Sequence, residues 1–109
     1  MRLAGLTANR DQSSFMGMET TVVRVPDHVL YRFVPEGGAV LLDLERREYF
    51  ALDDVAARMW EVLADTGVVA DIAEALVLEY DVRRSILLDD ADRFVRTLVE
   101  QNLIHRVDI

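Results

Sequence analysis

The sequence predicts one α+β domain in which three antiparallel strands precede three helices. Two observations support this prediction. Between residues 28 and 52, apolar side chains recur in three short runs that turn residues separate, as in paired strands. After residue 52, apolar residues recur every three or four positions, as on one face of a helix. A chain of 109 residues, 51% of them hydrophobic, has room for one small core.

The three predicted strands are short and closely spaced. They are "HVLYRFV" (28–34), "AVLLDL" (39–44) and "EYFAL" (48–52). Glu36-Gly37-Gly38 and Glu45-Arg46-Arg47 supply the two turns. Connections this short favour antiparallel neighbours, so we expect a three-stranded meander. The second strand is then central, and the first and third strands are the edges of the sheet.

The helical part divides into three amphipathic segments. The first is expected to be capped by Asp53 or Asp54 and to end at Gly67. The second covers 68–82, and the third runs from Leu87 or Leu88 to about Asn102. This βββααα order describes a winged-helix-like fold, and a fold of this kind does not define a function. The acids expected in the first turns of the third helix, where they would favour its dipole, are Asp89, Asp90 and Asp92.

Composition argues against several classes of function. There is no cysteine and there are two histidines, so we expect no metal and no cofactor. No nucleophile with an adjacent base and no glycine-rich phosphate loop is present, so we expect a protein that is not an enzyme. No apolar run is long enough to span a membrane and no secretory signal is present, so a soluble cytoplasmic protein is expected.

The charge of the chain is strongly acidic. Twelve arginines oppose twenty acidic residues, which gives a net charge of −8, and lysine is absent. A nucleic-acid-binding protein would be expected to be basic, so we expect no nucleic-acid partner. The acidic surface serves solubility or favours basic partners, and the sequence leaves both interpretations open.

Residues 1–20 show no hydrophobic period and few large apolar groups. We therefore expect a flexible tail over 1–20 and a folded domain over 21–109.

Three segments carry a resemblance to a known family. They are "GGAVLLDLERREYFALDDVAARMWEVL", "ADIAEALVLEYDV" and "DDADRFVRTLVEQNLI". In order and spacing they resemble the PqqD-like family, the precursor-peptide recognition elements of ribosomal-peptide (RiPP) maturation, over about 28–106. The chain departs from the family pattern at Arg47, where glycine is frequent, and at Pro35-Glu36-Gly37, which precedes the second strand here. With these departures it looks closer to the leader-binding protein of a lasso-peptide pathway.

The resemblance implies a function. Family members bind the leader segment of a precursor peptide as an added antiparallel strand beside the third strand, in a groove closed by the third helix. The implied partners are the leader peptide and a maturation enzyme, a lasso-type leader peptidase being favoured. A chaperone for a radical SAM enzyme of pyrroloquinoline quinone biosynthesis is the alternative.

On the third strand, the candidate peptide-binding residues form an edge without lysine or proline, the residues that commonly block strand edges. Phe50 and Leu52 share the face that we expect in the core, whereas Tyr49 either borders the groove or caps the sheet. The candidates are Glu48, Tyr49, Phe50, Ala51 and Leu52.

On the third helix, an apolar stripe wider than the core requires suggests a contact surface on the Leu88–Val99 side. The alternative is that a small domain buries more of this helix. We expect Arg96 to pair with an acidic side chain of the leader and Asp92 with a basic one. The candidates on this helix are Asp92, Val95, Arg96 and Val99.

Two other functions remain open from the residues. One is an acidic winged-helix module for DNA or protein contacts, which would need basic residues on the second or third helix, where arginines are scattered. The other is a structural domain whose edge strands pair with each other in an oligomer.

Overall fold

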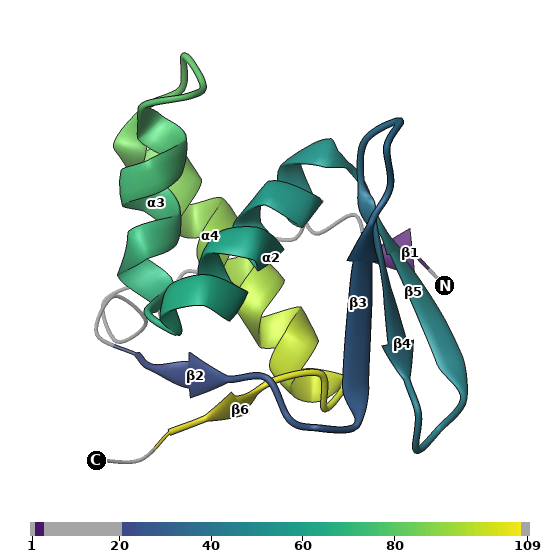
Figure 1. Ribbon diagram of the computed structural model, residues 1–109. Helices are drawn as coiled ribbons and strands as arrows, with labels where there is room; N and C mark the ends of the chain where they lie inside the picture. The colour runs from purple at the N-terminus through teal and green to yellow at the C-terminus, as the bar shows by residue number, and fades with distance from the viewer. Residues whose placement is uncertain (1, 4–20, 108–109) are drawn as a thin grey trace.

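A computed structural model of the chain describes residues 2–3 and 21–107. It confirms the α+β prediction, because a meander of three antiparallel strands is followed by three helices that lie on one side of the sheet (Figure 1). The strands are β3 (Val29–Phe33), β4 (Ala39–Asp43) and β5 (Glu48–Leu52), and the helices are α2 (Asp54–Thr66), α3 (Val69–Val77) and α4 (Arg84–Glu100).

The register of the sheet separates a buried face from an outer face. Leu41 of β4 pairs with Tyr31 of β3 and with Phe50 of β5, so these three side chains point toward the helices. Leu41 and Phe50 are fully buried, in one hydrophobic core with Trp60 of α2 and Phe94 of α4. The sheet therefore has its core on the helix side, and its outer face carries the alternate residues.

The turn between β4 and β5 is held by a buried carboxylate. Oδ1 of Asp43 accepts hydrogen bonds from the backbone N–H groups of Glu45 (2.9 Å) and Arg46 (3.1 Å). Asp43 is 1% exposed. Arg47 adopts φ 61°, the left-handed conformation that glycine accepts at no steric cost, which agrees with the glycine that is frequent at this place in the resembled family.

Asp43→Ala is expected to destabilise the fold by about 2 kcal/mol, because two backbone donors lose a charged acceptor. Urea denaturation followed by circular dichroism measures the effect. Arg46→Ala is the matched control in the same turn and is expected to cost less than about 0.5 kcal/mol, because its side chain is exposed. Equal losses in the two variants would contradict the role given to Asp43.

The ends of α2 confirm the predicted capping residues. The Asp53 side chain accepts a hydrogen bond from the Ala56 N–H at 2.9 Å. Gly67 takes the left-handed conformation, φ 73°, and its N–H donates to Leu63 O. The predicted start and stop of this helix were therefore right, and they fix the direction in which α2 leaves the edge strand β5.

The start of α4 differs from the prediction. The helix begins at Arg84, not at Leu87 or Leu88, and Arg83 at its N-cap makes no side-chain capping bond. The first turn accordingly holds no acidic residue, so the expectation that Asp89, Asp90 and Asp92 compensate the dipole in the first turns was wrong. At the other end, Asn102 adopts φ 61°, the conformation that the sequence led us to expect.

A second, two-stranded sheet closes the domain. β2 (Val23–Arg24) pairs antiparallel with β6 (His105–Arg106), and Leu103 and Ile104, which directly precede β6, are fully buried. The Val23 N–H also donates to Gly67 O at 2.7 Å, which ties β2 to the end of α2. The two-stranded sheet was not expected from the sequence, although the tuck of Leu103 and Ile104 onto the core was.

The predicted flexible tail over 1–20 lies outside the described residues except at Arg2–Leu3. These two residues form a short strand, β1 (Arg2–Leu3), which joins the main sheet in the order β1-β5-β4-β3. A strand at this place was not expected from the sequence.

Candidate functional site

The predicted binding edge is β5, and one part of it is paired. β1 runs parallel to β5, with Arg2 opposite Ala51 and Leu3 opposite Leu52. The expectation of a vacant edge was therefore wrong at Ala51 and Leu52, because the chain's own N-terminal residues lie there. Figure 1 shows β1 next to β5, and the strand order β1-β5-β4-β3 places it on the side of β5 away from β4. Any extended guest that uses the whole of β5 has to replace β1.

The side chains of β5 alternate as the strand period requires. Phe50 and Leu52 are buried, as predicted, whereas Glu48, Tyr49 and Ala51 are exposed. Tyr49 pairs with Leu42 in the register and therefore lies on the outer face of the sheet, away from the helices. The structure thus places Tyr49 on the outer face of the sheet, and its contact with a bound peptide stays a prediction.

The outer face of the sheet carries an apolar patch that the sequence analysis did not single out. Tyr49 is 64% exposed and Leu30 is 51% exposed, and both border a depression of about 640 Å³ that Val40 and Leu42 also line. The signal was present in "HVLYRFV", because apolar or aromatic residues occupy both faces of that strand. A strand that is apolar on both faces indicates a contact on each.

The α4 candidates differ in their accessibility. Val95 is fully buried and Asp92 is 1% exposed, whereas Val99 is half-buried and packs against the core. Asp92 and Arg96 lie one helical turn apart and form an ion pair, with Arg96 Nε 3.3 Å from Asp92 Oδ2. In this structure, therefore, the two charged residues that we expected to contact the leader form an ion pair with each other.

The β5 part and the α4 part of the predicted site pack in the same hydrophobic core. Phe50 and Leu52 of β5 share one cluster of buried side chains with Val95 of α4. The opposite flank of α4 is polar, since Arg93 forms ion pairs with Asp89 and Asp90. Binding at this place would use the backbone of β5 and the Arg96 charge of α4, because the side chains of Phe50, Leu52, Asp92 and Val95 are already buried.

The described part of the chain offers no arrangement for metal chemistry. Among residues 2–3 and 21–107, no group of three or more histidines and carboxylates is placed to hold a metal ion. Within the same residues, no helix is long and apolar enough to cross a membrane.

The fold and the strand edge together define a class of protein, a winged-helix-like α+β domain with a strand edge beside a helix that carries charged residues. Comparison with solved structures places the chain beside proteins of this class. TbiB1 in complex with the TbiA(beta) leader peptide matches with TM-score 0.70 and 31% identity, over 74% of this chain and 93% of that one. A lasso peptide synthetase B1 complexed with the leader peptide matches with TM-score 0.66 and 30% identity, over 79% and 98%.

A third structure is the PqqD truncation of Methylobacterium extorquens PqqCD, a stand-alone RiPP recognition element. It matches with TM-score 0.64 and 25% identity, over 95% of this chain and 100% of that one. The family model of coenzyme PQQ synthesis protein D (PqqD) matches residues 38–104. The chain belongs to the PqqD family, as its sequence resemblance indicated. No curated protein matches the chain.

Proposed function

We propose that this protein binds the leader segment of a ribosomally synthesised precursor peptide and delivers the precursor to a separate maturation enzyme. The observation that carries the proposal is the similarity, at 31% and 30% identity, to two proteins solved with leader peptides. A protein that binds the precursor without catalysing a reaction can serve as such an adaptor, because it raises the concentration of the precursor at the enzyme.

A lasso-type pathway is the favoured setting, and the recipient would be a leader peptidase. The identity to the lasso peptide synthetase B1 is 30%, whereas the identity to the PqqD truncation is 25%. Action with a radical SAM enzyme, as in quinone-cofactor biosynthesis, is the alternative. The fold itself does not separate the two settings, since both kinds of protein share it.

The leader would add to β5 as an extended strand and take the place of β1. The support for this step is that β5 already accepts a strand on this side, at Ala51 and Leu52. Main-chain hydrogen bonds then supply part of the affinity, about 0.5–1.5 kcal/mol each. The charge of Arg96 on α4 would supply selectivity for an acidic leader residue, and the buried Asp92 would hold Arg96 in place. The remaining contacts would come from Glu48, Tyr49 and Val99.

The decisive experiment uses N-methylated leaders. In an added strand, N–H groups of one parity point toward β5 and those of the other parity point away from it. We expect methylation of two successive N–H groups of the inward parity to weaken binding by at least tenfold, measured by calorimetry with the leader of the cognate precursor.

The control is the same leader methylated at the outward parity, which is expected to bind within about threefold of the unmodified peptide. Equal losses for both parities would rule out strand addition while leaving leader binding itself intact. No binding of the unmodified leader would overturn the proposed function as a whole.

A further inference from the structure

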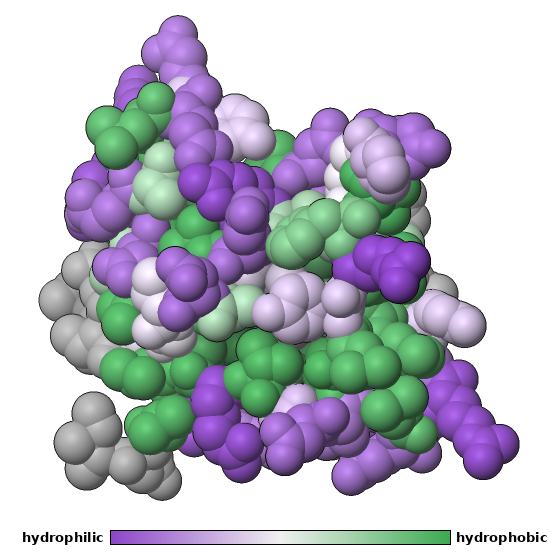
Figure 2. All heavy atoms as spheres, viewed as in Figure 1, coloured by the Kyte–Doolittle hydropathy of each residue, from purple (hydrophilic) through white to green (hydrophobic). Residues whose placement is uncertain are grey.

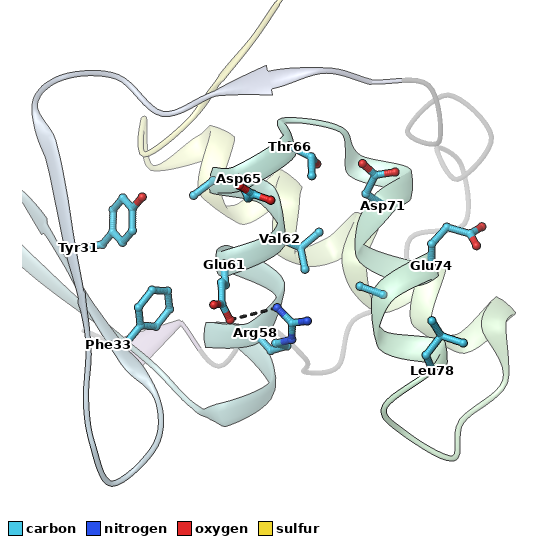
Figure 3. Close-up of a pocket in the computed structure, with 12 residues that line it drawn as sticks. Tyr31, Phe33, Arg58, Glu61, Val62, Asp65, Thr66, Asp71, Glu74 and Leu78 are labelled. Carbon is cyan, nitrogen blue, oxygen red and sulfur yellow. Dashed lines mark hydrogen bonds and ion pairs between the residues drawn. The ribbon is translucent and has the colours of Figure 1, made fainter.

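A second groove lies across α2, on the side of the domain opposite β5. It is a depression of about 820 Å³. Tyr31 and Phe33 project toward it from β3, Val62 of α2 lies in its floor, and Leu78 borders it at the end of α3 (Figure 3). β3 and β5 are the two outer strands of the meander, so the groove and the proposed leader edge are separated by the width of the sheet.

Several large apolar side chains on the walls of this groove are exposed to solvent. Leu78 is 86% exposed, Tyr31 is 44% exposed and Phe33 is 42% exposed. The Tyr31 ring packs edge-on against Trp60 (5.4 Å between centroids) and against Phe33 (6.0 Å), so the aromatic wall is held in place by the core. Exposed apolar groups that border one depression are typical of an interaction surface. Figure 2 shows this face, with hydrophilic residues over α3 and the loop after it.

The charge of the groove is acidic and only partly compensated. Four carboxylates line it, against one arginine, Arg58. Arg58 is already paired, because its Nε and Nη2 donate to the Glu79 carboxylate at 2.6–3.0 Å. These hydrogen bonds lower the pKa of Glu79 below its usual range. The lining carboxylates are Glu61, Asp65, Asp71 and Glu74.

Two of these carboxylates are available to a partner. Glu61 is paired with Arg58, and Glu74 with Arg84. Asp65 and Asp71 form no ion pair or side-chain hydrogen bond with any residue in the described part of the chain. They come from α2 and from the first turn of α3, so they lie on two different walls of the groove. A cation on each side of an apolar anchor would match this arrangement.

We propose that this groove docks a basic segment of a partner protein, one apolar side chain flanked by arginine or lysine. The apolar side chain would pack against Tyr31, Phe33 and Leu78, and the flanking cations would face Asp65 and Asp71. The proposal extends the adaptor role and in that respect rests on the proposed function, since the partner would be the maturation enzyme. Leader and enzyme would then occupy opposite edges of one small sheet and could be bound together.

The test uses a defined probe, acetyl-Arg-Val-Phe-Val-Arg-amide, with its Glu-flanked analogue as the charge control. We expect the basic probe to perturb the amide signals of Tyr31, Val62 and Leu78 in the full chain, and to bind at least fivefold more tightly than the acidic analogue. Trp60 is the only tryptophan and touches Tyr31, so its fluorescence gives a second readout. The affinity is expected to fall as salt rises.

Two variants locate the binding. Asp65→Asn with Asp71→Asn is expected to weaken binding of the probe about fivefold, because two solvent-accessible ion pairs with the probe are lost. Leu78→Ser is expected to weaken it by a similar factor with little effect on folding, since the side chain is exposed. The charge-matched control is Asp27→Asn with Glu100→Gln, both exposed and outside the groove, which should stay within twofold of the parent.

Several outcomes would overturn this proposal. They are equal binding of both probes, perturbations confined to β5 and α4, and equal losses in the groove and control variants. Self-association that Leu78→Ser abolishes would also overturn it, by assigning the groove to a second copy of the chain. Leader binding should be unchanged in all these variants. A chain that binds the probe but no leader would leave the groove established and the proposed function refuted.

Discussion

Removing residues 1–3 is expected to strengthen leader binding about tenfold. β1 pairs with Ala51 and Leu52 on the side of β5 where the leader would add, so the two strands compete for the same backbone groups. A competitor within the chain lowers the apparent affinity by the fraction of molecules whose edge is open. Two strand hydrogen bonds of about 0.5–1.5 kcal/mol each correspond to about 1–3 kcal/mol, and a tenfold change in affinity corresponds to about 1.4 kcal/mol. Calorimetric titration with the leader measures the change.

The matched control keeps β1 and changes only its side chains. Arg2→Val with Leu3→Val retains the backbone of the strand and raises its β propensity, so the leader is expected to bind this variant as the parent or more weakly. A shortened chain that binds no more tightly than the parent would show that β1 does not compete. Tighter binding in both variants would point to the Arg2 side chain instead of the strand.

Local signals in the sequence were sufficient for the meander and for α2. Asp53 and Gly67 are residues whose chemistry acts within one helical turn, and the structure places both where the sequence indicated. Asn102 was anticipated for the same reason, because its left-handed conformation depends on the residue itself. Phe50 and Leu52 were correctly assigned to the core because strand alternation is a local rule.

Features that depend on distant parts of the chain were missed. β1 meets β5 about fifty residues further along the chain, and two residues of pairing leave no period in the sequence. The early start of α4 was missed because Arg83 and Arg84 carry none of the usual capping signals. The groove across α2 depends on the partial exposure of Tyr31 and Phe33 on the helix side of β3, which the apolar run 28–34 does not distinguish from burial.

Reversing the charge of Arg96 is expected to weaken leader binding by at least tenfold. In the described structure Arg96 pairs with Asp92, which is 1% exposed, so this charge is held at a fixed place on α4. Arg96→Glu would set two carboxylates one turn apart and repel the acidic leader residue that we expect there. A partly desolvated charged contact is worth about 1.5–3 kcal/mol, which corresponds to roughly tenfold to a hundredfold in affinity. Competition binding at a temperature where every variant is folded measures the loss.

Arg96→Glu would also lower stability, because the buried Asp92 loses its ion pair with Arg96. Arg93→Glu is therefore the control: Arg93 pairs with Asp89 and Asp90, so its loss also costs stability, but it lies on the polar flank of the same helix. We expect Arg93→Glu to change leader affinity by less than threefold. A leader whose acidic residue is replaced by lysine should bind the Arg96→Glu variant more tightly than the unmodified leader does. The same replacement should weaken binding to the parent protein. Equal weakening in both variants, without that recovery, would mean that Arg96 acts on the fold alone, and the candidate contact on α4 would have to be abandoned.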